Sequence, residues 1–285
     1  MKRIDIVTKA WGDYELLDTG NNRKLERFGT MILDRPDPQA IWSKSTPDLW
    51  NNAQAQFSWT DKKEKWSITK GAPESWELSY TEMKLHIALG NFKHIGIFPE
   101  HAAQWEEVAS LVHKNQGLTM LNLFGYTGAA SIVAAQAGAK VTHIDASKQT
   151  ISTVKENMML SQLPADSIRL VCEDALKYAK RLVTRGETFD IIVMDPPAFG
   201  RGPKGEVWKI EESLAELVSL LPKLVAPHAK LVILNGYAAG YSARTFGEIL
   251  AEALPHGSIS YGDVGIAQNN SGRILSTGIY AKWQA

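Results

Sequence analysis

Residues 195–199, with the sequence Asp-Pro-Pro-Ala-Phe, carry the clearest chemical pattern in this chain of 285 residues. Two consecutive prolines hold an extended backbone without N–H donors, so backbone carbonyls and the Asp195 carboxylate are available as acceptors. The ring of Phe199 adds an apolar face for a flat substrate. We therefore predict Asp195, Pro196 and Phe199 as catalytic residues, with a plain Pro-Pro turn as the alternative.

A glycine turn and two acidic residues stand at comparable places upstream. The turn consists of Phe124, Gly125, Tyr126, Thr127 and Gly128. Its small residues either let a ligand approach the backbone or serve tight packing, and only two of the three glycines of a dinucleotide fingerprint are present. Asp145 follows about twenty residues later, where a carboxylate accepts hydrogen bonds from both hydroxyls of a ribose. Asp174, just before Ala175, would accept from the amine of adenine or cap a helix. This spacing favours an adenosyl cofactor.

The elements that would position these residues follow from the alternation of apolar and amphipathic segments after about residue 95. We predict parallel strands at 118–124, 140–144, 168–172, 189–194 and 230–234, with helices at 129–137 and 149–160. Strand-like segments at 258–264 and 274–281 would form a hairpin that closes the sheet. Because ligands bind beyond the carboxyl ends of such strands, the candidate residues should meet at one edge.

The first 94 residues differ in composition from the rest, since six of the nine tryptophans precede residue 80. We predict a small α+β domain at 1–94 and a catalytic domain at 95–285. One helix is expected near Pro47, with Leu49, Ala53 and Phe57 on its apolar face. The tryptophans would pack the core and a domain interface, or some of them would stack on bases.

The charge balance limits the partners of the protein. Lys+Arg and Asp+Glu both total 31, so no global field draws the chain to nucleic acid or to a membrane. A local candidate is the segment after Phe199, where Arg201, Lys204 and Trp208 would clamp a phosphate and a base. A solvated loop is the alternative for this segment.

The single cysteine, Cys172, excludes an intramolecular disulfide and a thiolate-cluster metal site, and we predict no metal. The chain shows no apolar run of secretory or membrane-spanning length. We therefore expect a cytoplasmic protein without membrane attachment.

These segments together resemble a known family. The sequences Leu-Asn-Leu-Phe-Gly-Tyr-Thr-Gly at 121–128, Asp-Ala-Ser at 145–147, Glu-Asp-Ala at 173–175 and Asp-Pro-Pro-Ala-Phe at 195–199 are similar to those of class I S-adenosylmethionine (SAM)-dependent methyltransferases. The chain most resembles the branch that contains bacterial large-subunit ribosomal-RNA methyltransferases, and His-Ile-Gly-Ile-Phe-Pro-Glu at 94–100 extends the likeness.

The resemblance implies an α/β, Rossmann-like domain whose seven-stranded, mostly parallel sheet ends in an antiparallel strand, preceded by a small α+β domain. It implies that Gly125 to Gly128 lie beneath the methionine part of SAM, that Asp145 holds the ribose and that Asp174 holds the adenine. The predicted cofactor-binding residues also include Phe124, Ala146, Ser147 and Ala175. Asp195 would contact both the cofactor and the methyl acceptor.

One departure from the branch narrows the chemistry. Covalent cytosine-C5 methylation needs a cysteine thiolate that attacks the ring. In the branch that this chain resembles, that cysteine usually follows the fifth strand, where this chain has Leu-Asn-Gly-Tyr at 234–237. We therefore predict direct in-line transfer to a nitrogen of a nucleobase in RNA, with ribosomal RNA as the partner. The substrate contacts would be Pro197, Arg201, Lys204 and Trp208. The alternatives are a protein or small-molecule amine or amide as acceptor, a nicotinamide-dependent oxidoreductase, and a non-catalytic RNA-binding module.

Overall fold

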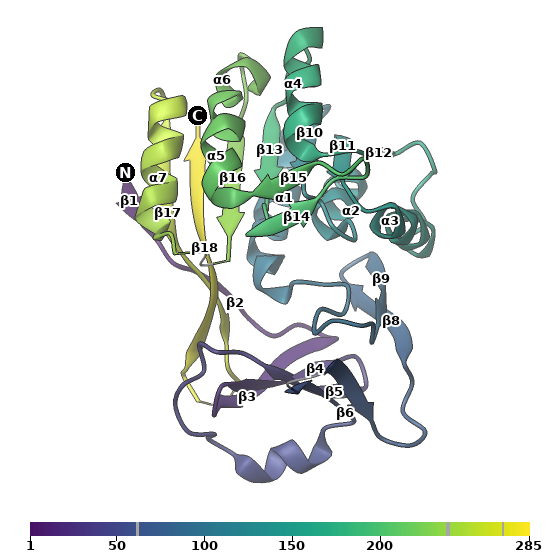
Figure 1. The fold of residues 1–285 in the computed structure, drawn as a ribbon. Coiled ribbons are helices and arrows are strands. Elements are labelled where there is room, and N and C mark those ends of the chain that lie inside the picture. The colour runs from purple at the N-terminus through teal and green to yellow at the C-terminus, as the bar shows by residue number, and fades with distance from the viewer. Residues whose placement is uncertain (61–62, 238–239, 270) are drawn as a thin grey trace. The chain divides into compact units, whose positions relative to one another are not determined.

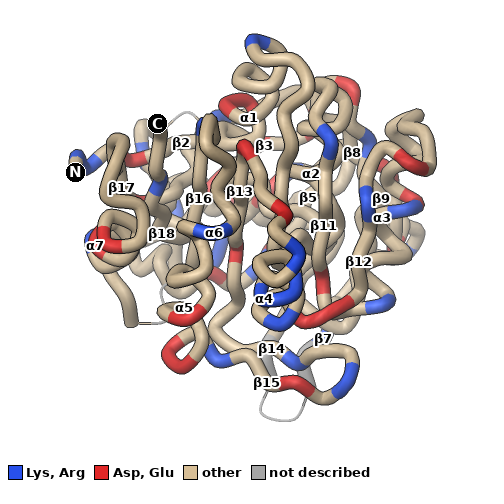
Figure 2. The backbone as a smooth tube through the Cα atoms, turned by 90° about the horizontal axis from the view of Figure 1, so that it is seen from above, with Lys and Arg blue, Asp and Glu red and all other residues tan. Residues whose placement is uncertain are grey.

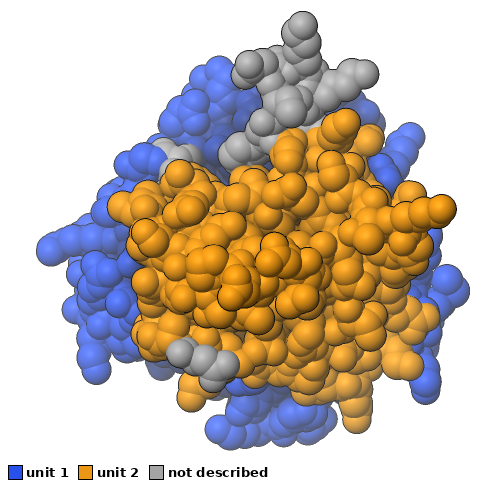
Figure 3. Space-filling view, turned by 90° about the horizontal axis from the view of Figure 1, so that it is seen from below, with its two compact units in different colours: residues 1–6, 104–264, 278–285 blue, residues 7–103, 265–277 orange. Residues whose placement is uncertain are grey.

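The computed structural model describes residues 1–60, 63–237, 240–269 and 271–285, and the chain forms two compact units (Figures 1 and 3). Unit 1 comprises residues 1–6, 104–264 and 278–285, and unit 2 comprises residues 7–103 and 265–277. This division differs from the predicted boundary at 94/95. Residues 95–103 belong with unit 2, where Thr8 donates to the Glu100 carbonyl at 2.8 Å. The 265–277 segment joins unit 2 as well, because Asn269 donates to the Leu16 carbonyl at 2.9 Å.

Unit 1 alternates strands and helices along the chain. The elements that lie wholly or mostly in unit 1 are β1 (Lys2–Arg3), α1 (Ala102–Lys114), β10 (Thr119–Leu123), α2 (Ala129–Gln136), β11 (Lys140–Asp145), α3 (Lys148–Leu160), β12 (Ile168–Cys172), α4 (Ala175–Arg185), β13 (Ile191–Met194), β14 (Phe199–Arg201), β15 (Val207–Lys209), α5 (Ile210–Ser219), α6 (Leu221–Leu224), β16 (Leu231–Gly236), α7 (Ala243–Ala253), β17 (Ser258–Ala267) and β18 (Ile274–Gln284). None of the helices in the described part of the chain has the length and apolar character needed to cross a lipid bilayer.

The main sheet of unit 1 has the order β1-β17-β18-β16-β13-β10-β11-β12. The pairs from β16 through β13, β10 and β11 to β12 are parallel, whereas β18 runs antiparallel to β16. All seven predicted strands are therefore present, and the last of them is antiparallel as predicted. Among the described residues, β1 and β2 (Ile6–Thr8) join the same sheet, so it has nine strands instead of the predicted seven. The predicted fold class is confirmed. β13 is buried along its whole length, as expected for a strand covered by helices on both faces.

Helices cover both faces of this sheet. The side chains of α4, α5, α6 and α7 share one hydrophobic core with the strand residues Leu121, Ile192 and Leu234. Figure 2 shows these four helices along one face of the sheet, whereas α1 and α2 lie along the other. The two helix layers leave the ends of the central strands as the place where loops can form a site.

Unit 2 is rich in β-structure. Its elements are β2 (Ile6–Thr8), β3 (Tyr14–Gly20), β4 (Arg23–Phe28), β5 (Met31–Pro36), η1 (Pro47–Asn52), β6 (Ala55–Thr60), β7 (Lys63–Ile68), β8 (Ser75–Tyr80), β9 (Met83–Ala88) and η2 (Pro99–His101), where η denotes a 3₁₀-helix. Strands β3 to β7 form one sheet in sequence order, and β8 pairs with β9. Leu25, Leu33 and Phe57 of the first sheet are fully buried.

The prediction of a helix near Pro47 with Leu49, Ala53 and Phe57 on one face is wrong. The chain forms only the 3₁₀-helix η1 there, because Ala53 already has an extended backbone, and Phe57 lies in β6 instead of on a helix face. β6 pairs in parallel with β5 through Leu33 and Ala55. This long-range pairing overrides the local helical spacing of the apolar residues.

The described tryptophans of unit 2 are held mainly by structural hydrogen bonds. The indole N–H of Trp11 donates to the Ser79 carbonyl at 3.1 Å, and that of Trp42 donates to the Thr19 hydroxyl at 2.9 Å. Trp50 is buried, and its N–H binds a carboxylate. These contacts agree with the packing interpretation for these residues, while the side chain of Trp59 lies outside the described part.

That carboxylate belongs to Asp18, which is fully buried in β3. Its donors among the described residues are the backbone N–H groups of Thr19, Ser45 and Thr46, the Trp50 indole and the Gln268 amide, at distances of 2.9–3.1 Å. Burial by itself would raise the pKa of Asp18, but these hydrogen bonds together lower that pKa below its ordinary value. The Asp18 carboxylate thus links β3, residues 45–50 and Gln268 of unit 2 through hydrogen bonds.

The Asp18→Ala substitution is expected to lower the free energy of unfolding by about 3–5 kcal/mol, because several buried donors lose their acceptor together. The lowered pKa makes the carboxylate's contribution fully present above the unfolded value of about 4. This contribution is lost as the pH falls through the folded value, so the gap between wild type and variant should narrow in acid. Urea unfolding followed by tryptophan fluorescence, at pH 7 and between pH 3 and 4, measures both effects.

Asp13→Ala is a matched control, since the Asp13 carboxylate accepts one backbone N–H, that of Ser79, at 2.8 Å. It should cost about 1 kcal/mol. Equal losses in the two variants, or a gap that widens in acid, would contradict the structural role of Asp18.

Candidate active site

Four predicted site segments come together at one edge of the main sheet. Leu123 at the end of β10 is in register with Ile144 of β11 and with Met194 of β13, and Asp145 is in register with Cys172 of β12. Because these strands are parallel and end at the same level, the loops that follow them leave the sheet side by side. The edge carries residues 124–128, 145–147, 173–175 and 195–199.

The loop after β10 has an unusual backbone. Phe124 and Tyr126 have positive φ angles of 59° and 50°, and Gly128 has a φ of 93°. Non-glycine residues adopt this conformation at some cost and are over-represented in functional loops. The Gly125 N–H donates to the Ile144 carbonyl at 2.9 Å, and the Tyr126 N–H donates to Asp145 Oδ2 at 3.0 Å. The second strand therefore fixes the shape of the first loop.

The two glycines of this loop are required by packing. A Cβ atom on Gly125 would lie 2.3 Å from Cε1 of His143, and one on Gly128 would lie 2.9 Å from Cγ1 of Val154. Of the two interpretations left open by the sequence, the structure supports tight packing for both residues. Close ligand approach is not needed to explain either glycine.

A buried polar group that the sequence analysis did not single out lies beneath the loop. His143 of β11 is fully buried, and its Nδ1 lies 2.9 Å from the Ser131 hydroxyl, which accepts from Asn122 Nδ2 at 2.9 Å. Burial lowers the pKa of His143 to about 4, so the imidazole is neutral at pH 7. A histidine within the apolar strand 140–144 was the only sequence signal of this group.

Asp145 ends β11 with both carboxylate oxygens aimed at backbone donors. Oδ2 accepts from Tyr126 N–H, and Oδ1 accepts from Ser147 N–H at 2.9 Å. Burial raises the pKa of Asp145, and these two hydrogen bonds oppose that shift. Each carboxylate oxygen has a second lone pair, so the group can still accept hydrogen bonds from a ligand.

Two other predicted cofactor residues begin helices. The Ser147 hydroxyl caps α3 by accepting from Thr150 N–H at 3.2 Å. Asp174 caps α4 by accepting from Lys177 N–H at 2.8 Å, and Ala175 is the first residue of that helix. The capping interpretation of Asp174 is therefore seen directly, and a helix N-terminus of this kind also presents free N–H groups beside the site.

The segment 195–199 leaves the sheet directly after β13, and the Asp195 N–H donates to the Leu123 carbonyl at 3.3 Å. The Pro197 carbonyl accepts from the Trp208 indole at 2.7 Å, and the Ala198 carbonyl accepts from Ile210 N–H at 3.0 Å. The Pro197 and Ala198 carbonyls, which belong to the backbone carbonyls predicted as acceptors for a ligand, therefore already accept hydrogen bonds within the protein. Phe199 is 54% exposed, so its ring is accessible to a ligand.

The segment after Phe199 forms the hairpin β14–β15. Phe199, Arg201 and Val207 lie on its outward face, because Phe199 is opposite Lys209 and Arg201 is opposite Val207. Trp208 lies on the other face and is 3% exposed. The prediction that Trp208 would stack on a base is therefore wrong. Side chains alternate between the two faces of a strand, and this alternation turns the Trp208 ring into the core.

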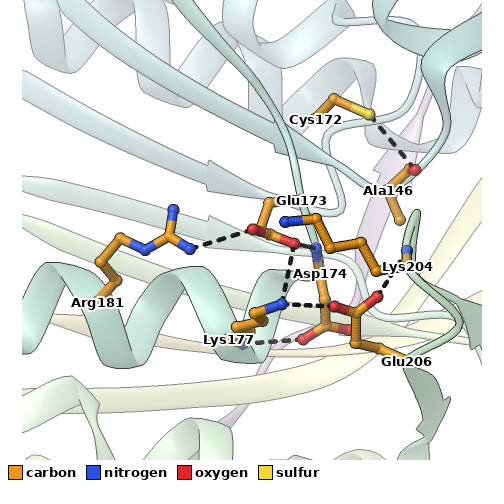
Figure 4. A network of polar contacts seen from close by, with 8 residues as sticks. All are labelled: Ala146, Cys172, Glu173, Asp174, Lys177, Arg181, Lys204 and Glu206. Carbon is orange, nitrogen blue, oxygen red and sulfur yellow. Dashed lines mark hydrogen bonds and ion pairs between the residues drawn. The ribbon is translucent and has the colours of Figure 1, made fainter.

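An ion network fastens this hairpin to α4 (Figure 4). Lys177 Nζ lies 2.7 Å from Glu206 Oε1 and 3.7 Å from the buried Glu173, which also binds Arg181 at 3.2 Å. The hydrogen bond from Lys177 lowers the pKa of Glu206 to about 2. The Lys204 N–H donates to Glu206 Oε2 at 2.9 Å, while the Lys204 side chain is exposed. The hairpin is an ordered element, so the solvated-loop alternative does not describe it.

Cys172 lies far from the 195–199 segment. It ends β12, which β11 and β10 separate from β13, or roughly 14 Å at ordinary strand spacing. Its Sγ donates to the Ala146 carbonyl at 3.6 Å. Burial and the nearby Asp145 raise the pKa of this thiol, so the thiolate is disfavoured.

The chain is similar to several known proteins. Residues 106–222 match the family model described as "Conserved hypothetical protein 95". The crystal structure of the SAM-dependent methyltransferase from Agrobacterium tumefaciens is 38% identical, with a TM-score of 0.94 over 99% of this chain and 93% of that chain. A SAM-dependent methyltransferase structure from Streptococcus mutans is 17% identical, with a TM-score of 0.72 over 95% of this chain and 75% of that chain, and shares the fold.

Curated relatives match a smaller part of the chain. The ribosomal RNA large subunit methyltransferase K/L of Shewanella oneidensis is 33% identical over 163 residues, which make up 56% of this chain. The same match covers 22% of that protein. The chain thus spans a minor part of the length of this longer relative.

Proposed function

The chain belongs to the SAM-dependent methyltransferases, and from this premise we propose that it transfers the methyl group to a nitrogen of a nucleobase in RNA, with ribosomal RNA as its substrate. The observation that carries the proposal is the 195–199 segment. Asp195 and Pro196 directly follow β13, and Phe199, three residues after Pro196, is exposed, at the sheet edge that also carries the glycine loop. A ribosomal-RNA substrate would place the protein in the cytoplasm.

The cofactor would be held by the loops of the same edge. The acceptor at this edge fits the cofactor, because the Asp145 carboxylate lies next to the 124–128 loop, where Oδ2 accepts from the Tyr126 N–H and keeps a second lone pair for a ribose hydroxyl. Gly125 to Gly128 would lie beneath the methionine part, Asp145 to Ser147 would face the ribose hydroxyls, and Asp174 and Ala175 would face the adenine. When bound, SAM supplies a methyl group on a positively charged sulfur.

The chain's own contribution to transfer would be positioning. Asp195 and the Pro196 carbonyl would accept the hydrogens of an exocyclic amine and aim its lone pair at the methyl group. For a ring nitrogen, they would instead hold a neighbouring donor. Stacking on Phe199 would fix the plane of the base. Holding reactants at about 3–3.5 Å can supply roughly 7–11 kcal/mol of the barrier, so no general base is required.

Direct transfer without a cysteine nucleophile is supported by the position of Cys172, which lies on the adenine side of the edge and has a raised thiol pKa. The fifth strand, β16, ends at Asn235 and Gly236, where the branch with covalent chemistry has its cysteine. The buried Asn235 amide exchanges hydrogen bonds with Gln104 at 2.8–2.9 Å. This place therefore offers no nucleophile.

RNA as the acceptor is supported by the name of the Shewanella relative and by the outward face of the β14–β15 hairpin. Phe199 and Val207 are 54% and 50% exposed there, with the Arg201 guanidinium 5.8 Å from the Phe199 ring. A stacking face beside a cation suits a base and its phosphate. Pro197, Arg201 and Lys204 would contact the RNA. Trp208 is buried and would act on the acceptor segment through its hydrogen bond to Pro197. The N-terminal unit would contribute to the choice of acceptor.

The decisive experiment incubates the purified protein with labelled SAM and total RNA from cells that lack its gene, followed by digestion to nucleosides. We expect label in one methylated nucleoside of ribosomal RNA, and little label when the RNA comes from wild-type cells. Label found only in protein or in small molecules would identify an amine or amide acceptor of another class. Binding of SAM without transfer to any of these would point to a non-catalytic RNA-binding module.

Arg201→Gln is expected to weaken RNA binding several-fold at low salt and to reduce the slope of log affinity against log salt by about 1, because one phosphate contact is lost. SAM affinity should not change. Arg244→Gln removes the same charge from α7, where Arg244 pairs with Glu248 at 3.3 Å, and should leave RNA binding unchanged. Fluorescence anisotropy with a labelled RNA at several salt concentrations makes the measurement. Identical slopes in the two variants would remove the hairpin from the RNA-binding surface.

A further inference from the structure

Trp208 contacts two segments that come from different strands. Its indole N–H donates to the Pro197 carbonyl at 2.7 Å, on the acceptor segment after β13. Its ring lies 4.7 Å from the Phe124 ring, at an interplanar angle of 60°, on the glycine loop after β10. The side chain is 3% exposed and belongs to the hydrophobic core of unit 1.

The two prolines limit how the backbone of the acceptor segment can be held. Pro196 and Pro197 have no N–H groups, so only their carbonyls can be fixed by hydrogen bonds. The Pro197 carbonyl accepts the hydrogen bond from the Trp208 indole N–H. The bond is formed by a buried donor, which would otherwise remain unsatisfied, and this favours a single geometry.

The hairpin that carries Trp208 is itself well anchored. The Lys177–Glu206 ion pair at 2.7 Å and the Gly202 N–H, which donates to the Glu206 carbonyl at 2.8 Å, hold its turn. At the other end, Ile210 N–H binds the Ala198 carbonyl. The hairpin is thus held at both ends, and its Trp208 side chain contacts both the acceptor segment and the glycine loop.

We propose that Trp208 is a positioning residue, which sets the acceptor segment 195–199 at a fixed distance from the cofactor loop 124–128. This inference rests on the proposed function in one respect, namely that residues 195–199 hold the methyl acceptor. The residue acts through Pro197 and Phe124 and does not touch the reacting atoms. Since a displacement of about 1 Å can cost 10²-fold in rate, losing the link should affect the transfer step more than binding.

The test compares Trp208→Phe, which keeps a ring and loses the N–H, with Trp283→Phe. Trp283 is a matched control, because it is also buried in unit 1 and also donates its indole N–H to a backbone carbonyl, that of His256. We expect Trp208→Phe to lower the single-turnover transfer rate by about 10- to 100-fold, with the Kd for SAM within about threefold of wild type. Trp283→Phe should reduce thermal stability to a similar degree and leave the transfer rate unchanged.

Hydrogen exchange measured by mass spectrometry provides a second readout that needs no acceptor. Trp208→Phe should speed exchange in peptides that cover 124–128 and 198–201, and Trp283→Phe should not. An unchanged single-turnover rate in Trp208→Phe, or unchanged exchange in both peptides, overturns the inference. A wild-type protein that transfers methyl to no RNA instead contradicts the proposed function, and the exchange result then decides whether Trp208 links the two loops.

Discussion

Replacing Asp195 with alanine is expected to lower the rate of methyl transfer by about 10²- to 10³-fold while leaving the affinity for SAM within a few-fold of wild type. The reason is that Asp195 directly follows β13, at the start of the acceptor segment, and would orient the amine hydrogens, whereas the ribose and adenine contacts would come from the loops after β11 and β12. Asp195→Asn retains one acceptor oxygen and should lose less activity. Single-turnover rates with saturating SAM, together with calorimetric SAM binding, separate the two quantities.

Asp190→Asn is a matched control just before the first residue of the same strand. The Asp190 carboxylate accepts from the Thr119 N–H and hydroxyl at 2.9 and 2.8 Å, and it lies at the opposite end of β13 from the site. This variant should lose some stability and keep its transfer rate. Full activity in Asp195→Ala would remove Asp195 from the chemistry, and a complete loss of SAM binding would make its role one of cofactor binding only.

Gly125→Ala is expected to have the largest effect on stability among changes in the glycine loop. The new Cβ would meet His143 at 2.3–2.4 Å and Asn122 Nδ2 at 3.0 Å, and His143 is buried and tied to Ser131. The backbone of Gly125 is not in the left-handed region, so the cost is steric. We expect a loss of about 3 kcal/mol in the free energy of unfolding. SAM binding should weaken more than tenfold, because the displaced loop is the one that would hold the methionine part.

The second substitution His143→Ala tests this explanation. It makes room for the new methyl group, so the double variant should be more stable than the sum of the two single losses predicts, by about 1–2 kcal/mol. Gly90→Ala is the control, because a Cβ there meets nothing within 4 Å and Gly90 does not have a positive φ. Additive losses in the double variant would show that Gly125 is required for another reason. Urea unfolding and calorimetry measure the two quantities.

The candidate site was largely predictable because its residues follow strands. Apolar runs of four to seven residues, each followed by a polar or glycine turn, located β10, β11, β12 and β13 to within a few residues. Parallel topology then brought the turns to one edge without any knowledge of side-chain contacts. The roles of single side chains were less predictable, as Ser147 and Asp174 show, because a helix cap and a ligand contact require the same polar residues.

The errors have a common origin in long-range contacts. Leu49, Ala53 and Phe57 have the spacing of a helix face, but β6 forms because Ala55 pairs with Leu33 of β5. The basic residues around Trp208 in the sequence favour a role in substrate contact. The pairing of β14 with β15 decides instead that Trp208 points inward and that Phe199, Arg201 and Val207 point outward. A shift of one residue in that register would have reversed the assignment.

The sequence by itself determined the fold class, the positions of the strands along the chain and the acceptor motif, because these depend on periodicity and on local composition. Only the tertiary structure decided why Gly125 is a glycine and which charges near the site are already paired. Gly125 accommodates His143, a residue 18 positions away in the chain, and Lys177 and Arg181 are neutralised by Glu173 and Glu206. Such contacts join separate strands and loops, and their energies depend on distances that no single stretch of sequence contains.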